Sequence, residues 1–231
     1  MSQAGSTQTG GTPALGGTGG EPTAGTSAVA GTGGEPSGGT PSLGGTGGEP
    51  TGGTPGVGGK PPVTYGEPVT LESQNVESTF VISCYPLANY GMDPTLVVDK
   101  EPCLSDILIK PSIAEIPSDA LIKEATITLT CTNAGPGLGV FRPQADWSAN
   151  TVTWSTRPAA TASLGTIGAI NEGGFVIDAT SLVQAWVDGT REPFGLALRT
   201  EDTDGLIFAS SRAPDVNQRP RFAVTYVVPL K

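Results

Sequence analysis

The sequence predicts an all-β fold: a β-sandwich or jelly roll of about 8–10 strands with one short helix, preceded by a disordered Gly/Thr/Pro-rich tether. From Thr70 onward, apolar and polar residues alternate with period two, which is typical of strands. Clusters of turn-forming residues separate these segments at short intervals. The earlier residues differ, because 22 of the 34 glycines precede Lys60 and the first aromatic residue is Tyr65. We therefore expect a tether over 1–62 and one sandwich domain over 63–231.

The predicted tether is built from short repeats. Thr-Gly-Gly-Glu-Pro recurs at 18–22, 32–36 and 46–50, a period of fourteen residues. Each repeat holds about one sizeable apolar residue, too little burial to offset a backbone entropy cost of ~1–2 kcal/mol per ordered residue. Disorder is the expected outcome, and the segment then acts as a flexible spacer.

The clearest predicted strands lie at 124–131 and 221–228. In the first, Ala125, Ile127 and Leu129 alternate with threonines, as expected for a half-buried strand. Further strands are predicted at 78–83, 95–99, 106–113, 139–142, 175–177, 194–199 and 205–210.

One segment breaks the period of two. Residues 178–189 carry an i, i+1, i+4, i+5 apolar stripe that predicts a short amphipathic helix packed on one end of the sandwich. Asp178 or Thr180 can cap its start, and Gly189 ends it. The stripe consists of Leu182, Val183, Trp186 and Val187.

Composition excludes several function classes. The chain has no histidine, so Ser-His-Asp catalysis and histidine metal sites are excluded. A net charge of −10 argues against a nucleic-acid partner, and no apolar run approaches the ~20 residues of a membrane span. The first residues show no signal peptide. We expect an extracellular or cell-surface protein whose leader, and any N-terminal lipid anchor, lie outside this sequence.

In an exported protein, two of the three cysteines would form a disulfide and the third would keep a free thiol. The favoured disulfide joins Cys84 and Cys103, which flank one loop, and Cys131 then continues an inward row as a buried free thiol. The alternative pairs Cys103 with Cys131.

Residues 147–158 read Trp-Ser-Ala-Asn-Thr-Val-Thr-Trp-Ser-Thr-Arg-Pro. Together with shorter stretches elsewhere, this segment resembles the DNRLRE (disaggregatase-related repeat) family, which overlaps with a class of carbohydrate-binding modules. The resemblance spans roughly 75–228, and 147–158 is its most specific piece. One piece departs from the family pattern. Where the family has a strand that begins with arginine, this sequence reads Cys-Leu-Ser-Asp-Ile-Leu-Ile-Lys-Pro, at 103–111. The resemblance implies a jelly roll and, less firmly, polysaccharide binding. The other similar pieces lie at 88–98, 116–129, 178–189, 194–198, 208–211 and 219–226.

Sugar binding usually uses exposed aromatic faces, with arginine or lysine for anionic sugars. We expect Trp147 and Trp154 to lie in the core, which leaves Tyr90, in a turn-forming loop, as the candidate exposed aromatic. The candidate cations at or within predicted strands are Lys110, Arg142, Arg199 and Arg212.

Calcium is the one cofactor that the sequence suggests. Asp202 and Asp204 lie in Glu-Asp-Thr-Asp-Gly, which is first of all a turn, but carboxylates at this spacing also suit Ca²⁺. Asp93 is a second candidate ligand. The matching glutamate of a full calcium loop is missing.

The leading prediction is a non-enzymatic extracellular polysaccharide-binding or adhesion module on a flexible surface tether, whose polysaccharide can be anionic. One alternative is a self-associating structural subunit of an extracellular coat or fibre, in which sheet edges pair between chains. A second alternative is a polysaccharide-cleaving enzyme that uses carboxylates.

Overall fold

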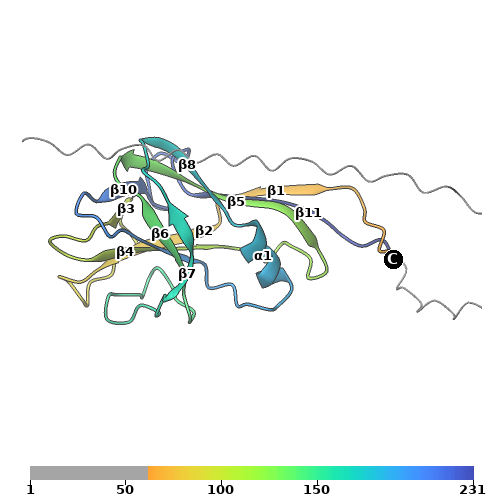
Figure 1. Cartoon of the computed structure of the whole chain (residues 1–231), viewed down its shortest axis with the longest axis horizontal. Coiled ribbons are helices and arrows are strands. Elements are labelled where there is room, and N and C mark those ends of the chain that lie inside the picture. The colour runs from red at the N-terminus through yellow and green to blue at the C-terminus, as the bar shows by residue number, and fades with distance from the viewer. Residues whose placement is uncertain (1–61) are drawn as a thin grey trace, which may run out of the picture. The chain divides into compact units, whose positions relative to one another are not determined.

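The computed structural model describes residues 62–231, which form two antiparallel sheets packed face to face (Figure 1). The predicted tether, apart from its last residue, lies outside the described residues. The all-β prediction is confirmed, with eleven strands and one helix in this part of the chain. No helix within it is long and apolar enough to cross a membrane.

The first sheet has six strands. Its order is β1–β11–β5–β10–β3, and β8 also pairs with β5. The long strand β5 pairs with β11, β10 and β8, so it organises the sheet. The strands are β1 (Val69–Ser73), β3 (Thr95–Val98), β5 (Leu121–Asn133), β8 (Gly173–Asp178), β10 (Leu206–Ala209) and β11 (Arg221–Val227).

The second sheet has five strands in the order β2–β4–β9–β6–β7. Strand β4 lies between β2 and β9, and its outward side chains therefore have neighbours on both sides. The strands are β2 (Val76–Ile82), β4 (Ser105–Pro111), β6 (Leu138–Arg142), β7 (Ala162–Ile167) and β9 (Leu196–Arg199).

Strands β1 and β7 were not predicted as strands. Both lie at sheet edges and are mostly exposed, so their apolar pattern is weak. Strand β7 also contains Gly165 at φ +144°, a conformation that side chains rarely adopt.

The core lies between the two sheets. Ala125, Ile127, Leu129 and Cys131 of β5 are all buried, as the alternation predicts. Cys131 is the buried free thiol, and burial raises its pKa.

The helix α1 (Thr180–Val187) packs against β5. All four residues of its predicted apolar stripe are buried. Asp178 Oδ1 accepts hydrogen bonds from the Thr180 amide (2.9 Å) and hydroxyl (2.7 Å) at the start of the helix. Gln184 ties the helix to the sheet, because its amide accepts from Ile122 N and donates to Ala120 O.

The N-cap residue is Ala179 and no side chain caps the helix, so neither Asp178 nor Thr180 is the cap that the sequence predicted. We predict that Asp178→Ala lowers the free energy of unfolding by about 1 kcal/mol at neutral pH, because it removes both hydrogen bonds from Thr180, the first helical residue. Hydrogen bonds from Thr180 hold the pKa of the Asp178 carboxyl below its ordinary value. The ionised carboxylate therefore stabilises the fold above the ordinary pKa, and this contribution is lost as the pH falls through the lowered pKa. Urea denaturation of wild type and Asp178→Ala across that pH range should show their free energies of unfolding becoming equal in acid.

Asp178→Asn is the matched control, because its amide oxygen still accepts a hydrogen bond but does not titrate. A stability difference between wild type and Asp178→Ala that stayed constant with pH would contradict the assignment.

A second apolar cluster lies on the outer face of the five-stranded sheet. Residues 143–161, the tryptophan loop, connect β6 to β7 and cover this face. The loop contributes Trp147, Ala149, Val152 and Ala160, which pack on strand residues Val81, Leu108 and Ala197. Trp147 is buried, as predicted, whereas Trp154 is only half-buried.

The loop of residues 83–94, between β2 and β3, holds the tryptophan loop in place. Asn89 Nδ2 donates to the carbonyls of Ala149 and Val152, both at 2.7 Å. A Cβ atom added at Gly91 would lie 2.0 Å from the Ala149 carbonyl oxygen, so only glycine permits this approach. Two of the sequence motifs, Asn-Tyr-Gly and Trp-Ser-Ala-Asn, are therefore the two sides of one contact.

Gly91→Ala should lower the free energy of unfolding by about 1–3 kcal/mol, because the methyl group would meet backbone atoms that cannot move independently. Gly168→Ala is the control, since nothing lies within 4 Å of the added atom there. The measurement is chemical denaturation of both variants. Equal stability of the two would disprove a tight backbone contact at Gly91.

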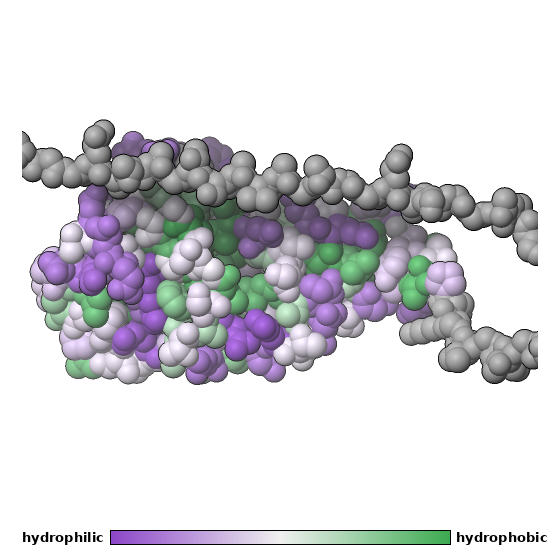
Figure 2. Space-filling model, in the orientation of Figure 1, coloured by the Kyte–Doolittle hydropathy of each residue, from purple (hydrophilic) through white to green (hydrophobic). Residues whose placement is uncertain are grey.

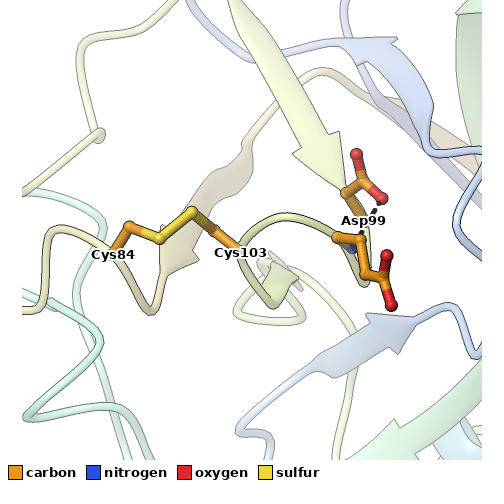
Figure 3. The surroundings of a disulfide bond; sticks show 4 residues. Cys84, Asp99 and Cys103 are labelled. Atoms are coloured by element: carbon orange, nitrogen blue, oxygen red, sulfur yellow. Dashed lines mark hydrogen bonds between the residues drawn. A yellow bond between two sulfur atoms is a disulfide. The ribbon is translucent and has the colours of Figure 1, made fainter.

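The structure contains the disulfide Cys84–Cys103, the favoured of the two predicted pairings (Figure 3). It joins the start of the β2–β3 loop to the segment that precedes β4. Ser83 N also donates to Leu104 O at 2.8 Å, so covalent and hydrogen bonds connect the same two segments.

Candidate functional site

Three charged side chains from separate segments meet on the outer face of the five-stranded sheet. Ile107 of β4 pairs with Leu198 of β9, so the neighbouring outward residues Asp106 and Arg199 lie side by side. Arg199 Nη2 is 3.0 Å from Asp106 Oδ2, and Arg157 Nε of the tryptophan loop is 3.5 Å from the same oxygen. We call Arg157 and Arg199, together with the Asp106 carboxylate that they share, the arginine pair.

The carboxylate is more buried than the two cations. Asp106 is 6% exposed, whereas the side chains of Arg157 and Arg199 are 28% and 27% exposed. The guanidinium of Arg157 lies 3.4 Å from the centroid of Trp154, and that of Arg199 lies 5.1 Å from the centroid of Phe141. Both arginines are therefore held from below by aromatic rings and from the side by one carboxylate.

Each guanidinium keeps free hydrogen-bond donors. Arg199 Nη1 donates to Ala160 O at 2.7 Å, and Arg157 Nη1 donates to Trp154 O at 2.5 Å. An arginine has five N–H groups, so these contacts leave donors on both side chains for a ligand.

The arginine pair borders a cavity of about 240 Å³. This volume suits one small polar group or a single sugar unit rather than a large ligand. The wall also contains Asp99, Leu104, Ser105, Trp154, Thr200 and Glu201.

Burial raises the pKa of the Asp106 carboxyl, although the charges of Arg199 and Arg157 act in the opposite direction. Burial also lowers the pKa of Arg157, but a guanidinium stays charged at neutral pH. With Asp106 ionised, these three groups carry a net charge of +1, but the carboxylates of Asp99 and Glu201 lie in the same wall, so the lining holds two cations and three carboxylates, a net charge of −1. Binding of an anion at this cavity therefore depends on direct hydrogen bonds from the two guanidiniums.

Of the five predicted ligand-binding residues, only Arg199 borders this cavity. Lys110 lies at the other end of β4, where its Nζ is 3.1 Å from Glu77 Oε2 and 3.0 Å from Asp146 Oδ1. The same nitrogen donates to the Trp147 carbonyl and lies 4.8 Å from the centroid of the Trp147 ring. These contacts show Lys110 holding the tryptophan loop on the sheet.

The other three predicted residues lie apart from the arginine pair. Arg142 is half-exposed at the end of β6. It lies three residues beyond Gly139, the residue that pairs with Arg199. Arg212 is exposed after β10, beside a polar depression that contains Asn75 and Asn150.

Tyr90 is half-buried rather than exposed. Its ring stacks on Phe80, with centroids 4.3 Å apart, because docking of the β2–β3 loop draws it toward the core.

The predicted calcium ligands lie in two places. Asp93 precedes β3 and accepts hydrogen bonds from Thr95, whereas Asp204 precedes β10. Since β3 and β10 are antiparallel, Leu206 pairs with Val98 and Ala209 with Thr95, and the two aspartates lie at opposite ends of this ladder. Asp202 Oδ1 accepts from Thr203 N at 2.8 Å, as in a turn. Within residues 62–231, no three acidic or cysteine side chains gather in a way that would hold a metal ion.

Sequence reasoning did not select Arg157. It lies in the Trp-Ser-Thr-Arg-Pro stretch that was recognised as a motif, so the signal was present. Its role became visible only when the fold brought the tryptophan loop over Asp106.

Two antiparallel sheets packed face to face, with long loops docked on one outer face, define a class of protein, the β-sandwich module. Residues 69–226 match the model of carbohydrate-binding module family 96, and the chain belongs to this family. The match supports a carbohydrate-binding module rather than a catalytic domain. A comparison with curated proteins found no match. The narrower resemblance to DNRLRE domains stays a prediction.

Asp106→Asn should lower the free energy of unfolding by about 1–3 kcal/mol, because two guanidiniums would lose their shared carboxylate. Asp146→Asn is the control, since the Asp146 side chain is 72% exposed and its ion pair should contribute less than about 1 kcal/mol. Urea denaturation compares the two. Equal effects would show that burial of Asp106 adds nothing to the strength of its ion pairs.

Proposed function

We propose that this protein is a non-enzymatic module that binds a polysaccharide, and that the arginine pair recognises an acidic unit of the sugar chain. The observation that carries the proposal is the sharing of one buried carboxylate by two arginines. Membership of a carbohydrate-binding family supplies the ligand class, and the arginine pair supplies the preference for a carboxylate.

The chemistry of the arginine pair suits a uronate. A guanidinium can bind a carboxylate through two parallel N–H···O bonds, and such charge-assisted bonds are stronger than neutral ones. Contacts with Asp106, Trp154 and Phe141 already fix the two side chains, so binding costs little additional side-chain entropy.

The net charge of −10 would oppose non-specific attraction of a polyanion. Binding of an acidic polysaccharide must then depend on direct contact at the arginine pair. At physiological ionic strength the Debye length is about 8 Å, so distant acidic residues repel the chain only weakly. Asp99 and Glu201 lie in the cavity wall itself, and the hydrogen bonds from the two guanidiniums must outweigh their repulsion.

We further propose that the protein works outside the cell or on its surface. The Cys84–Cys103 disulfide supports an oxidising compartment. A flexible tether over 1–62 would let the module reach its ligand while attached elsewhere.

Direct binding tests the main proposal. The full chain is run in native affinity gels cast with acidic polysaccharides (polygalacturonate, alginate, hyaluronate) and neutral ones (xylan, β-glucan), with calcium or with a chelator. We expect retardation by at least one acidic polysaccharide. Retardation that disappears with the chelator would implicate calcium, and Asp202→Asn with Asp204→Asn would then test its ligands.

Arg157→Gln and Arg199→Gln should each weaken binding about 10- to 100-fold, the loss expected for a hydrogen-bonded charged contact. Isothermal titration calorimetry measures the affinity, and chemical denaturation checks the fold. Arg199→Lys keeps the charge but not the guanidinium fork, so it should restore only part of the affinity.

Arg142→Gln and Arg212→Gln are matched controls, because each removes the same charge away from the pocket. A larger loss in either control than in Arg199→Gln would move the binding site to that residue. Retardation by neutral polysaccharides alone would contradict recognition of an acidic unit.

A structural role remains the second candidate, because β7 and β8 are strands at the edges of the two sheets. Between them lies an apolar groove of about 290 Å³, and Val176 on β8 is 57% exposed. Figure 2 shows green apolar surface on this side of the molecule, where Figure 1 places β6, β7 and β8. Concentration-dependent polymers in sedimentation, together with no retardation in any gel, would favour this role.

A further inference from the structure

The most exposed large apolar side chains of residues 62–231 lie on one loop. In the β2–β3 loop, Leu87 is 80% exposed, Met92 is 70% exposed and Tyr85 is 63% exposed. Apolar side chains this exposed add nothing to the packed core, so a loop that carries three of them is a candidate binding surface.

The backbone on each side of Tyr85 is attached to a segment that carries wall residues of the arginine pair's cavity. The residue before it, Cys84, is bonded to Cys103, and Ser83 donates to Leu104, which lines the cavity. On its other side, the carbonyl of Pro86 accepts a hydrogen bond from Ser155 N at 3.0 Å. Ser155 directly follows Trp154, another wall residue.

Both neighbours of Tyr85 in the chain are therefore bonded to residues that directly adjoin wall residues of the same cavity, Leu104 and Trp154. Figure 3 shows the disulfide between Cys84 and Cys103, which connects the β2–β3 loop to the segment that carries Asp99. Asp99 also lines the cavity.

Each aromatic ring at the arginine pair already contacts a guanidinium. One face of Trp154 carries the Arg157 guanidinium, and half-buried Phe141 lies beneath Arg199. Among the described aromatic residues only Tyr65 and Tyr85 are exposed, and Tyr65 pairs with Pro229 near the C-terminus. Tyr85 is thus the exposed aromatic side chain on the loop that is tied to the cavity wall, and no aromatic ring or cation among the described residues stacks on it.

We propose that Tyr85 forms a second subsite, on which the apolar face of the sugar next to the acidic unit stacks. This inference rests on the proposed function and adds to it a minimum ligand: a chain of at least two sugars, one at the arginine pair and the next on Tyr85. The disulfide positions the subsite, because it fixes the residue before Tyr85 relative to the cavity wall.

The pair of subsites explains how a cavity of about 240 Å³ can serve a polymer. One unit enters the cavity, and the chain continues over the exposed loop. An aromatic ring gives contact area at a low entropy cost, and its quadrupole attracts the slightly positive C–H face of a sugar.

The test uses the full chain and oligouronates of one, two and four units, prepared from the acidic polysaccharide that retards the wild type. We expect wild type to bind the dimer and tetramer more tightly than the monomer. Tyr85→Ala should lose about 3- to 10-fold in affinity for the longer chains while keeping the wild-type affinity for the monomer. Tyr85→Phe should behave like wild type.

Met92→Ala is the matched control, because it removes an exposed apolar side chain from the same loop, next to the buried contact of Gly91. Arg199→Gln should weaken binding of every chain length equally. This difference separates the Tyr85 subsite from the arginine pair.

Three results would overturn the subsite. Tyr85→Ala could bind the longer chains as tightly as wild type while Arg199→Gln does not, which would leave the proposed function intact. Tyr85→Ala could instead abolish a concentration-dependent dimer seen in sedimentation with no effect on sugar affinity, which would make the loop a self-association surface. Lack of polysaccharide binding by wild type would overturn the proposed function and this inference together.

Discussion

The interaction on which the rest of the structure depends is the packing of the tryptophan loop on the outer face of the five-stranded sheet. A β-sandwich normally leaves such a face to solvent, but here Val81, Leu108 and Ala197 are apolar and covered. The cover buries Asp106, which in turn gathers the two arginines. Without it, Asp106 would be an ordinary surface carboxylate.

The two ends of this covered face use similar chemistry with opposite results. At one end Lys110 is matched by two carboxylates, Glu77 and Asp146, and the group carries a net charge of −1. At the other end two arginines share Asp106, so there the cations outnumber the carboxylates that contact them. A cation next to a tryptophan occurs at both ends. The candidate binding site differs because its guanidiniums keep N–H donors that Asp106 does not use, whereas Lys110 Nζ already contacts Glu77, Asp146 and the Trp147 carbonyl.

The sequence predicted the fold better than the site. The predictions of the buried row of β5 and of the apolar stripe of α1 were correct, because local periodicity determines which of their residues face the core. Tyr90 was expected to be exposed but is half-buried, and the loop that carries it is held by a contact between Gly91 and Ala149, which lie 58 residues apart in the chain. Likewise, nothing local in Arg157 shows that Asp106 will lie beneath it. Strand pairing and loop docking bring such residues together, and neither is visible from composition or spacing.

The Asn-Tyr-Gly and tryptophan motifs therefore act first on structure. Asn89 and Gly91 fix the β2–β3 loop to the tryptophan loop, and the Cys84–Cys103 disulfide fixes the same loop to the segment before β4. Each attachment also determines where the exposed part of the loop lies relative to the arginine pair. A ligand that needs both surfaces would meet them already in position, so little of its binding energy would be spent on ordering the protein.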